Sequence, residues 1–96
     1  MESYDQLLEE CKEVARDAED VGAVERWLDC PADVEFICNA CHEYLGGRLF
    51  VAVGGPAIYI DTRRQSVEGI WFADRVSVPC DADLVDKMLR NRWECF

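Results

Sequence analysis

The chain has 96 residues, half of them apolar, which suffices for one modest hydrophobic core and leaves no room for a second domain. Twenty acidic residues against ten basic residues give a net charge of −10, which argues against direct binding to nucleic acid, because phosphates are contacted by basic side chains. No apolar run approaches the ~20 residues of a membrane-spanning helix, and the acidic beginning of the chain lacks the apolar core of a secretion signal. We therefore expect one cytoplasmic domain over residues 1–96 with no membrane contact.

The negative charge is concentrated in the first half of the chain. Residues 1–48 carry 13 acidic and 4 basic residues, a net charge of −9, whereas residues 49–96 carry 7 and 6, a net charge of −1. No Ser- or Pro-rich linker separates the halves. The domain is therefore expected to combine an acidic helical half over residues 1–47 with a nearly neutral half over residues 48–96.

Two helices are predicted first. Apolar residues recur at three-to-four spacing after Ser3, which fits a capping box with Gln6, so the first helix is predicted over residues 3–21. Gly22 is a natural end for it. A short second helix is predicted over residues 23–29.

A third helix is predicted to begin at Cys30-Pro31 and to end at Gly46-Gly47. Proline suits the first position of a helix because its missing N–H group would be unpaired there in any case. The apolar residues between these limits fit one stripe of a helix, formed by Val34, Ile37, Cys38, Cys41, Tyr44 and Leu45.

The second half of the chain shows patterns typical of strands. Branched and aromatic residues lie between turn signals, of which Gly54-Gly55-Pro56 is the strongest. The predicted strands cover residues 48–53, 57–62, 67–72 and, as a short fourth strand, 75–78. Gly69 indicates a bulge, and Pro79 closes the last strand because it cannot donate to a ladder. Asp81 or Asp83 is expected to cap a final helix that runs to about residue 92.

Helices followed by strands and a last helix predict an α+β fold. The connections between the strands are too short for parallel crossovers, so the sheet should be antiparallel. The expected architecture is a set of N-terminal helices packed on a small antiparallel β-meander of three to four strands, with a C-terminal helix and with the helices on one face.

Six cysteines raise the question of a metal site. Cys38-Asn39-Ala40-Cys41 is a C-x-x-C motif followed by His42, and a fourth ligand from Cys30 or Cys80 would complete a tetrahedral zinc site. However, no second C-x-x-C motif exists, and both sulfurs fall on the apolar stripe of the predicted third helix. We favour buried core thiols and predict no cofactor. Zinc stays as an alternative, with the candidate ligands Cys30, Cys38, Cys41 and His42.

No enzyme signature stands out in the sequence. Gly54-Gly55-Pro56 is too short for a phosphate-binding loop and joins two strands rather than a strand and a helix. His42 is the only histidine, and the acidic residues near the C-x-x-C motif disfavour a reactive thiolate. We therefore predict a binding protein without catalytic residues.

An acidic row runs along the first predicted helix. Carboxylates recur every four residues at Asp5, Glu9, Glu13 and Asp17, and Asp20 adds to them. On a helix, this spacing places successive charges ~6 Å apart. Like charges at this spacing cost up to ~0.5 kcal/mol per pair in an isolated helix, so a chain that keeps them together could be using their field. Such a row can occupy a Lys/Arg groove that normally receives phosphates, and these five residues are the candidate partner-binding site.

A solvated face is the alternative interpretation of the acidic row. Exposed charge keeps small proteins soluble. Neighbouring bases also reduce the repulsion, because Lys12 lies within reach of Glu9, and Arg16 within reach of Glu13 and Asp20. Both interpretations fit the sequence.

Two further surface features are candidates for binding. Arg63 and Arg64 at the predicted hairpin tip could contact an acidic partner or a phosphate, although charge at a strand end more often discourages edge aggregation. The apolar segment Trp93–Phe96 either packs back on the domain or contacts a partner, such as a second copy in a homodimer. A module that binds through this C-terminus, for example an antitoxin or small regulator, is the alternative function.

Three segments resemble those of small proteins carried by phages and mobile elements: Val53–Pro56, Ile60-Asp61-Thr62 and Val67–Trp71. The chain is also similar in size and charge to anti-CRISPR and anti-restriction inhibitors. The resemblance implies an inhibitor, in the cytoplasm of a bacterial host, that binds a CRISPR effector subunit or another defence nuclease where DNA would bind. It supplies no site residues.

Overall fold

A computed structural model describes residues 2–30 and 33–95, with the side chains of residues 2 and 3 left out. The chain forms the elements α1 (Glu2–Asp17), α2 (Val21–Asp29), β1 (Asp33–Cys38), β2 (Tyr44–Ala52), β3 (Ala57–Asp61), β4 (Ser66–Trp71), β5 (Asp74–Pro79) and α3 (Asp83–Glu94). The predicted capping hydroxyl of Ser3 lies outside the described side chains.

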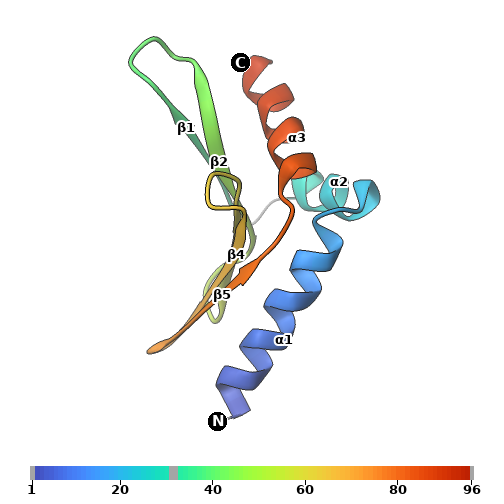
Figure 1. Cartoon of the computed structure of the whole chain (residues 1–96), viewed down its shortest axis with the longest axis vertical. Coiled ribbons are helices and arrows are strands. Elements are labelled where there is room, and N and C mark those ends of the chain that lie inside the picture. Colours follow the sequence, from blue (N-terminus) through green and yellow to red (C-terminus); the bar gives the residue numbers. More distant parts are fainter. Residues whose placement is uncertain (1, 31–32, 96) are drawn as a thin grey trace.

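The five strands form one antiparallel sheet in the order β1-β2-β3-β4-β5. The three helices lie on one side of this sheet, and the other face is open (Figure 1). The α+β class, the antiparallel meander and the terminal helices are thus confirmed. The strand number is five rather than three to four, because the segment predicted as a third helix supplies β1 and the first part of β2.

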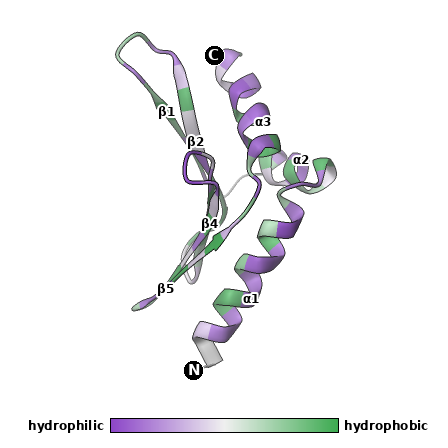
Figure 2. Ribbon diagram, in the orientation of Figure 1, coloured by the Kyte–Doolittle hydropathy of each residue, from purple (hydrophilic) through white to green (hydrophobic). Residues whose placement is uncertain are grey.

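Helix α1 packs on β4 and β5 through its apolar stripe. Leu7 and Cys11 are fully buried, and polar and apolar positions alternate along the helix (Figure 2). A Cβ atom on Gly69 of β4 would lie only 2.5 Å from the Cys11 sulfur and 2.9 Å from a Leu7 methyl group. The regular register of β4 with both neighbours shows no bulge at Gly69, so that expectation was wrong. Gly69 instead allows the helix to approach the strand closely.

The boundary between α1 and α2 is set by Asp20 rather than by Gly22. Helix α1 ends at Asp17, four residues before the predicted end. The Asp20 carboxylate accepts a hydrogen bond of 2.9 Å from the Ala23 backbone and caps α2, so Gly22 lies inside that helix. At α3, the N-cap residue is Ala82 and no side chain caps the helix, so the expected cap by Asp81 or Asp83 was wrong.

The predicted third helix is wrong, because residues 33–52 form a β-hairpin. Val34 pairs with Leu49, and Phe36 pairs with Gly47. The Asn39 side chain closes the turn, since its Oδ1 accepts hydrogen bonds from the backbone of Cys41 at 2.9 Å and of Glu43 at 3.0 Å. The helical part of the N-terminal half therefore ends at Asp29 rather than near residue 47.

Helix α3 packs against the same hairpin. The Tyr44 hydroxyl of β2 donates a hydrogen bond of 2.7 Å to the Asp86 carboxylate. Near the C-terminus, the Trp93 ring lies 5.4 Å from the Phe36 ring, and its indole N–H donates to the His42 carbonyl at 3.3 Å. The C-terminal helix thus folds back onto the protein, and Phe96 lies outside the described residues.

Candidate interaction surface

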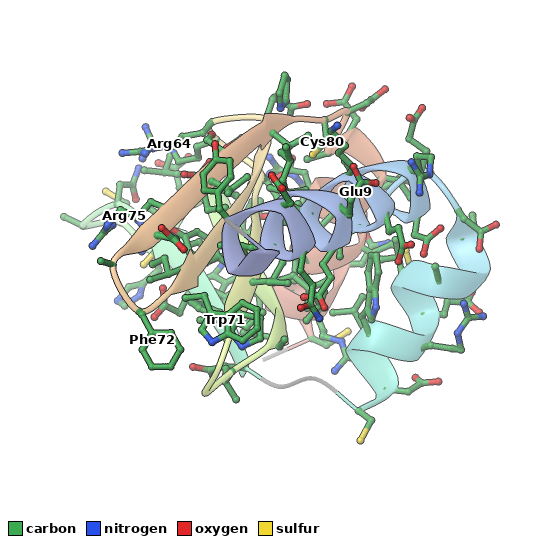
Figure 3. All side chains as sticks on the ribbon, turned by 90° about the horizontal axis from the view of Figure 1, so that it is seen from below. Glu9, Arg64, Trp71, Phe72, Arg75 and Cys80 are labelled. Carbon is green, nitrogen blue, oxygen red and sulfur yellow. The ribbon has the colours of Figure 1, made fainter. Side chains whose placement is uncertain are left out.

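All five residues of the predicted acidic site are exposed. Asp5, Glu9, Glu13 and Asp17 lie on α1, whose opposite side is buried against the sheet, and Asp20 lies at the start of α2. We call these five residues the acidic row. Glu9 lies on the helical side of the molecule, whereas Arg64 and Arg75 project on the other side of the sheet (Figure 3).

Most carboxylates of the acidic row are exposed to solvent and have no ion-pair partner among the described residues. Glu9 forms an ion pair with Lys12, at 3.5 Å. Asp5, Glu13 and Asp17 form no ion pair with any of the described basic side chains, so Arg16 does not neutralise the row as expected. Residues 2–29 hold ten acidic and three basic residues, a net charge of −7. The two N-terminal helices therefore form the strongly negative part of the surface.

The predicted burial of the C-x-x-C cysteines is wrong. Cys38 and Cys41 are exposed at the end of the β1–β2 hairpin, and Cys30 is exposed at the end of α2. Strand geometry explains the difference, because the hairpin turn extends the segment away from the core that a helix would have faced. Cys11 is the cysteine that is buried, and burial raises the pKa of its thiol from 9.0 to about 11.

The candidate metal ligands do not form one site. Cys38, Cys41 and His42 share the hairpin end, but Cys30 does not join them. Within residues 2–30 and 33–95, no three or more His, Cys, Asp or Glu side chains gather where they could hold one metal ion. A zinc site within one chain therefore has no geometric support among the described residues.

The structure reveals a cavity on the open face of the sheet that sequence analysis missed. It has a volume of about 340 Å³ and is lined by Ile37, Arg48, Asp61, Arg63 and Arg64. The sequence indicated Arg63 and Arg64 as a binding feature. It did not indicate Arg48 or Asp61, because their pairing across β2 and β3 joins residues far apart in the chain.

Asp61 organises this cavity from beneath. Its side chain is only 4% exposed. One carboxylate oxygen accepts hydrogen bonds from the backbone of Arg63 at 3.0 Å and of Arg64 at 3.1 Å. The other oxygen lies 3.5 Å from Nε of Arg48 and 3.9 Å from Nε of Arg64. An Asp that precedes a turn by one or two residues is a recognisable turn signal, and it could have indicated the first of these roles.

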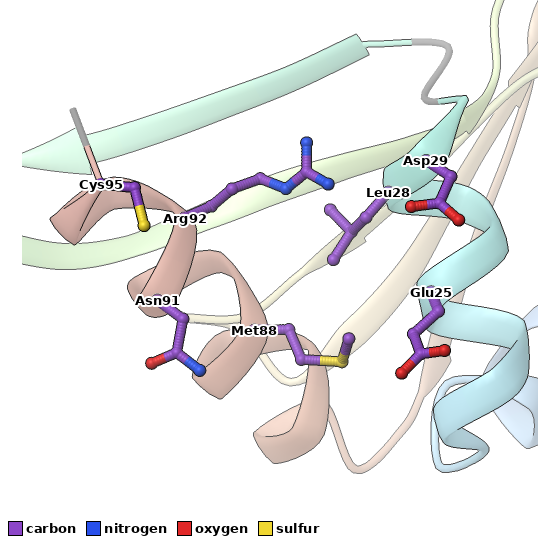
Figure 4. A pocket seen from close by; sticks show the side chains of 7 residues that line it. All are labelled: Glu25, Leu28, Asp29, Met88, Asn91, Arg92 and Cys95. Carbon is purple, nitrogen blue, oxygen red and sulfur yellow. The ribbon is translucent and has the colours of Figure 1, made fainter.

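A second cavity, of about 420 Å³, lies between α2 and α3 (Figure 4). Its lining comprises Glu25, Leu28, Asp29, Met88, Asn91, Arg92 and Cys95. Acidic groups on α2 thus face amide and guanidinium groups on α3 across apolar side chains. The lining joins helices that are distant in the sequence, which is why helical periodicity alone did not reveal it.

Two further findings concern the membrane and the comparison with known proteins. None of the described helices is long and apolar enough to cross a membrane. No protein-family model, curated protein or solved structure matches the chain.

Proposed function

We propose that the protein is a non-enzymatic inhibitor of a bacterial defence nuclease. In this proposal, the acidic row occupies a basic channel of the nuclease and blocks DNA binding, in the manner of an anti-CRISPR protein acting in the cytoplasm of a bacterial host. The observation that carries the proposal is the exposure of all five carboxylates on helices whose other side is fixed against the sheet.

The spacing of the carboxylates supports this role. Successive charges of the row are ~6 Å apart along α1. Phosphates on one DNA strand recur every ~3.4 Å along the axis, so the row approximates every second phosphate. Because Asp5, Glu13 and Asp17 have no basic partner among the described residues, their charge is available to another molecule. Such a field also accelerates encounter with a basic partner.

The alternative of an interaction module built on the apolar C-terminus has less support. The Trp93 indole is engaged within the chain by Phe36 and by the His42 carbonyl. A partner that took up this side chain would have to break both contacts. We therefore propose that the partner binds the acidic row.

Charge reversal tests the proposal. We expect the triple variant Glu9→Lys, Glu13→Lys, Asp17→Lys to lose binding to the nuclease, because three attractive contacts become repulsive. The control variant Asp33→Lys, Glu43→Lys, Glu94→Lys makes the same change in net charge at exposed positions outside α1 and should bind like the unmodified protein.

The measurement is a pull-down from lysates of bacteria that carry CRISPR and restriction systems, with mass spectrometry of the bound proteins at low and moderate salt. A nuclease subunit should be retained at low salt and released as salt rises, because exposed charges are screened. Circular dichroism should show that both variants keep the native fold. Retention of the same nuclease by the α1 variant at unchanged affinity would contradict the proposal.

A further inference from the structure

The open face of the sheet carries a feature that the acidic row does not use. On β2 and β3, Arg48 lies opposite Asp61, and in the next such pair Phe50 lies opposite Tyr59. Leu49 and Ile60, between these pairs, point to the helical side and are fully buried. A charged pair and an aromatic pair are therefore neighbours on the face that the helices leave open.

The charged part of this feature has an excess of cations. One oxygen of Asp61 is occupied by backbone N–H groups, so a single oxygen faces the nearby arginines. Glu35 receives a hydrogen bond of 3.2 Å from the Arg48 guanidinium, but Nε of Arg48 is buried without a hydrogen-bond partner. Arg63 forms no ion pair with any described carboxylate. Two carboxylates thus pair with Arg48 and Arg64, and Arg63 adds a third guanidinium group at the same cavity, in a chain whose net charge is −10.

Gly46 leaves space for the Arg63 side chain to lie over the sheet. A Cβ atom at Gly46 would lie 2.4 Å from Cγ of Arg63 and 3.0 Å from its Cδ. The aliphatic part of Arg63 therefore crosses β2 where that strand has no side chain. This path brings Arg63 to the cavity that Arg48 and Arg64 also line.

The aromatic part provides a pair of half-buried rings beside the cations. The rings of Phe50 and Tyr59 are 4.8 Å apart and inclined by 34°, and both residues are half-buried. The Arg48 guanidinium carbon lies 5.8 Å from the Tyr59 ring centre, which links the two parts. A ligand that spans them needs an anionic group at one end and a planar ring at the other.

We propose that this site binds a nucleoside monophosphate, with the phosphate at Arg48, Arg63 and Arg64 and the base against Tyr59 and Phe50. Guanidinium forks match phosphate oxygens in pairs, and bases stack on aromatic rings. The cavity of about 340 Å³ would hold the phosphate end of the ligand, and the base would lie beside the cavity, because Tyr59 and Phe50 do not line it. The net charge of −10 disfavours a long polyanion, which selects a mononucleotide over a nucleic-acid strand. The site lies across the sheet from the acidic row and does not depend on the proposed function.

Titration with three probes tests the two halves of the site. Adenosine 5′-monophosphate, adenosine and inorganic phosphate are each added to labelled protein, and amide and Tyr59 ring shifts are followed by NMR. We expect saturable binding of the monophosphate about tenfold or more tighter than that of either other probe, because adenosine forgoes the charge-assisted contacts and phosphate forgoes the stacking. Equal affinity for phosphate and the monophosphate, or no saturable shift around the cavity, would overturn the proposal.

Matched variants locate the site. Replacing both Arg63→Gln and Arg64→Gln should weaken binding of the monophosphate about tenfold or more, and both side chains are exposed enough to leave folding intact. Arg75→Gln removes a charge from the same face outside the cavity and should change affinity less than about twofold. Equal weakening by both variants would overturn the proposal, as would tighter binding of a single-stranded oligonucleotide.

Discussion

Gly69, which has no side chain, allows α1 to pack closely on the sheet. The sequence marks Gly69 as unusual within a strand, but it does not show that Cys11 and Leu7 occupy the space where a Cβ atom would be. The contact joins β4 to α1, which is far from it in the sequence. Only the folded arrangement therefore explains why glycine is needed here.

Replacing this glycine by alanine should destabilise the protein. In Gly69→Ala, the new methyl group would overlap the Cys11 sulfur and push α1 away from β4, so we expect a loss of about 1–3 kcal/mol in the free energy of unfolding. Gly55→Ala is the control, because a Cβ atom there would be 3.8 Å from the nearest atom, the Trp71 indole nitrogen. Urea denaturation of both variants measures the difference, and equal midpoints would show that α1 does not pack as described.

The β1–β2 hairpin shows where sequence patterns mislead at the scale of an element. The stripe that predicted a helix omitted Phe36, although Val34 and Phe36 alternate as in a strand and pack with the core. Asn39 also carried a turn signal, through the side chain that closes the hairpin. A short apolar run fits both the helical and the strand period, and here the pairing with β2 makes the segment a strand.

Thiol labelling distinguishes the hairpin from a helix with buried cysteines. At neutral pH, we expect iodoacetamide to modify the exposed Cys30, Cys38, Cys41 and Cys95 first, and the buried Cys11 last. Burial and a raised pKa both protect the Cys11 thiol. Mass spectrometry of digests taken over time gives the order, and unfolded protein should label uniformly. Slow labelling of Cys38 and Cys41 would support the helix that the structure excludes.

Over the whole molecule, the sequence predicted properties that depend on local patterns and charge better than it predicted contacts between distant residues. The α+β class, the antiparallel meander and the exposure of the acidic row followed from local patterns and charge. The cavity around Asp61 did not, because it depends on the register between β2 and β3. The end of the N-terminal helical part was also mispredicted. The segment after Asp29 forms a strand because it pairs with β2, and local patterns do not show this pairing.

Three titratable groups that are buried or partly buried at the core limit stability at high pH. Burial raises the pKa of Cys11 and of Cys80 from 9.0 to about 11, and burial together with the Asp86 hydrogen bond raises that of Tyr44. Their stabilising contribution is complete below the unfolded pKa values and is lost as the pH rises through the folded values. Between about pH 9 and pH 11, Cys11 alone should account for a loss on the order of 2 kcal/mol.

Urea midpoints measured across this pH range test the expectation. The midpoint should be steady near neutral pH and fall above about pH 9. Cys11→Ala, although less stable at every pH, should show a shallower fall because the unfolded chain no longer gains that thiolate. A midpoint independent of pH up to about pH 11 would show that these groups are not buried in the way described.

The sequential order of the strands has a consequence for the growing polypeptide. Each strand pairs with its neighbour in the chain, so the sheet can form progressively from β1 to β5 during synthesis. Helix α1 emerges before the sheet, but it packs on β4 and β5, which emerge much later. At a synthesis rate of ~5–20 residues per second, the apolar stripe of α1 stays exposed for several seconds before β4 and β5 can cover it. Ribosome-bound chains that end before β4 would therefore expose this stripe to chaperones, and completion of β5 closes that interval.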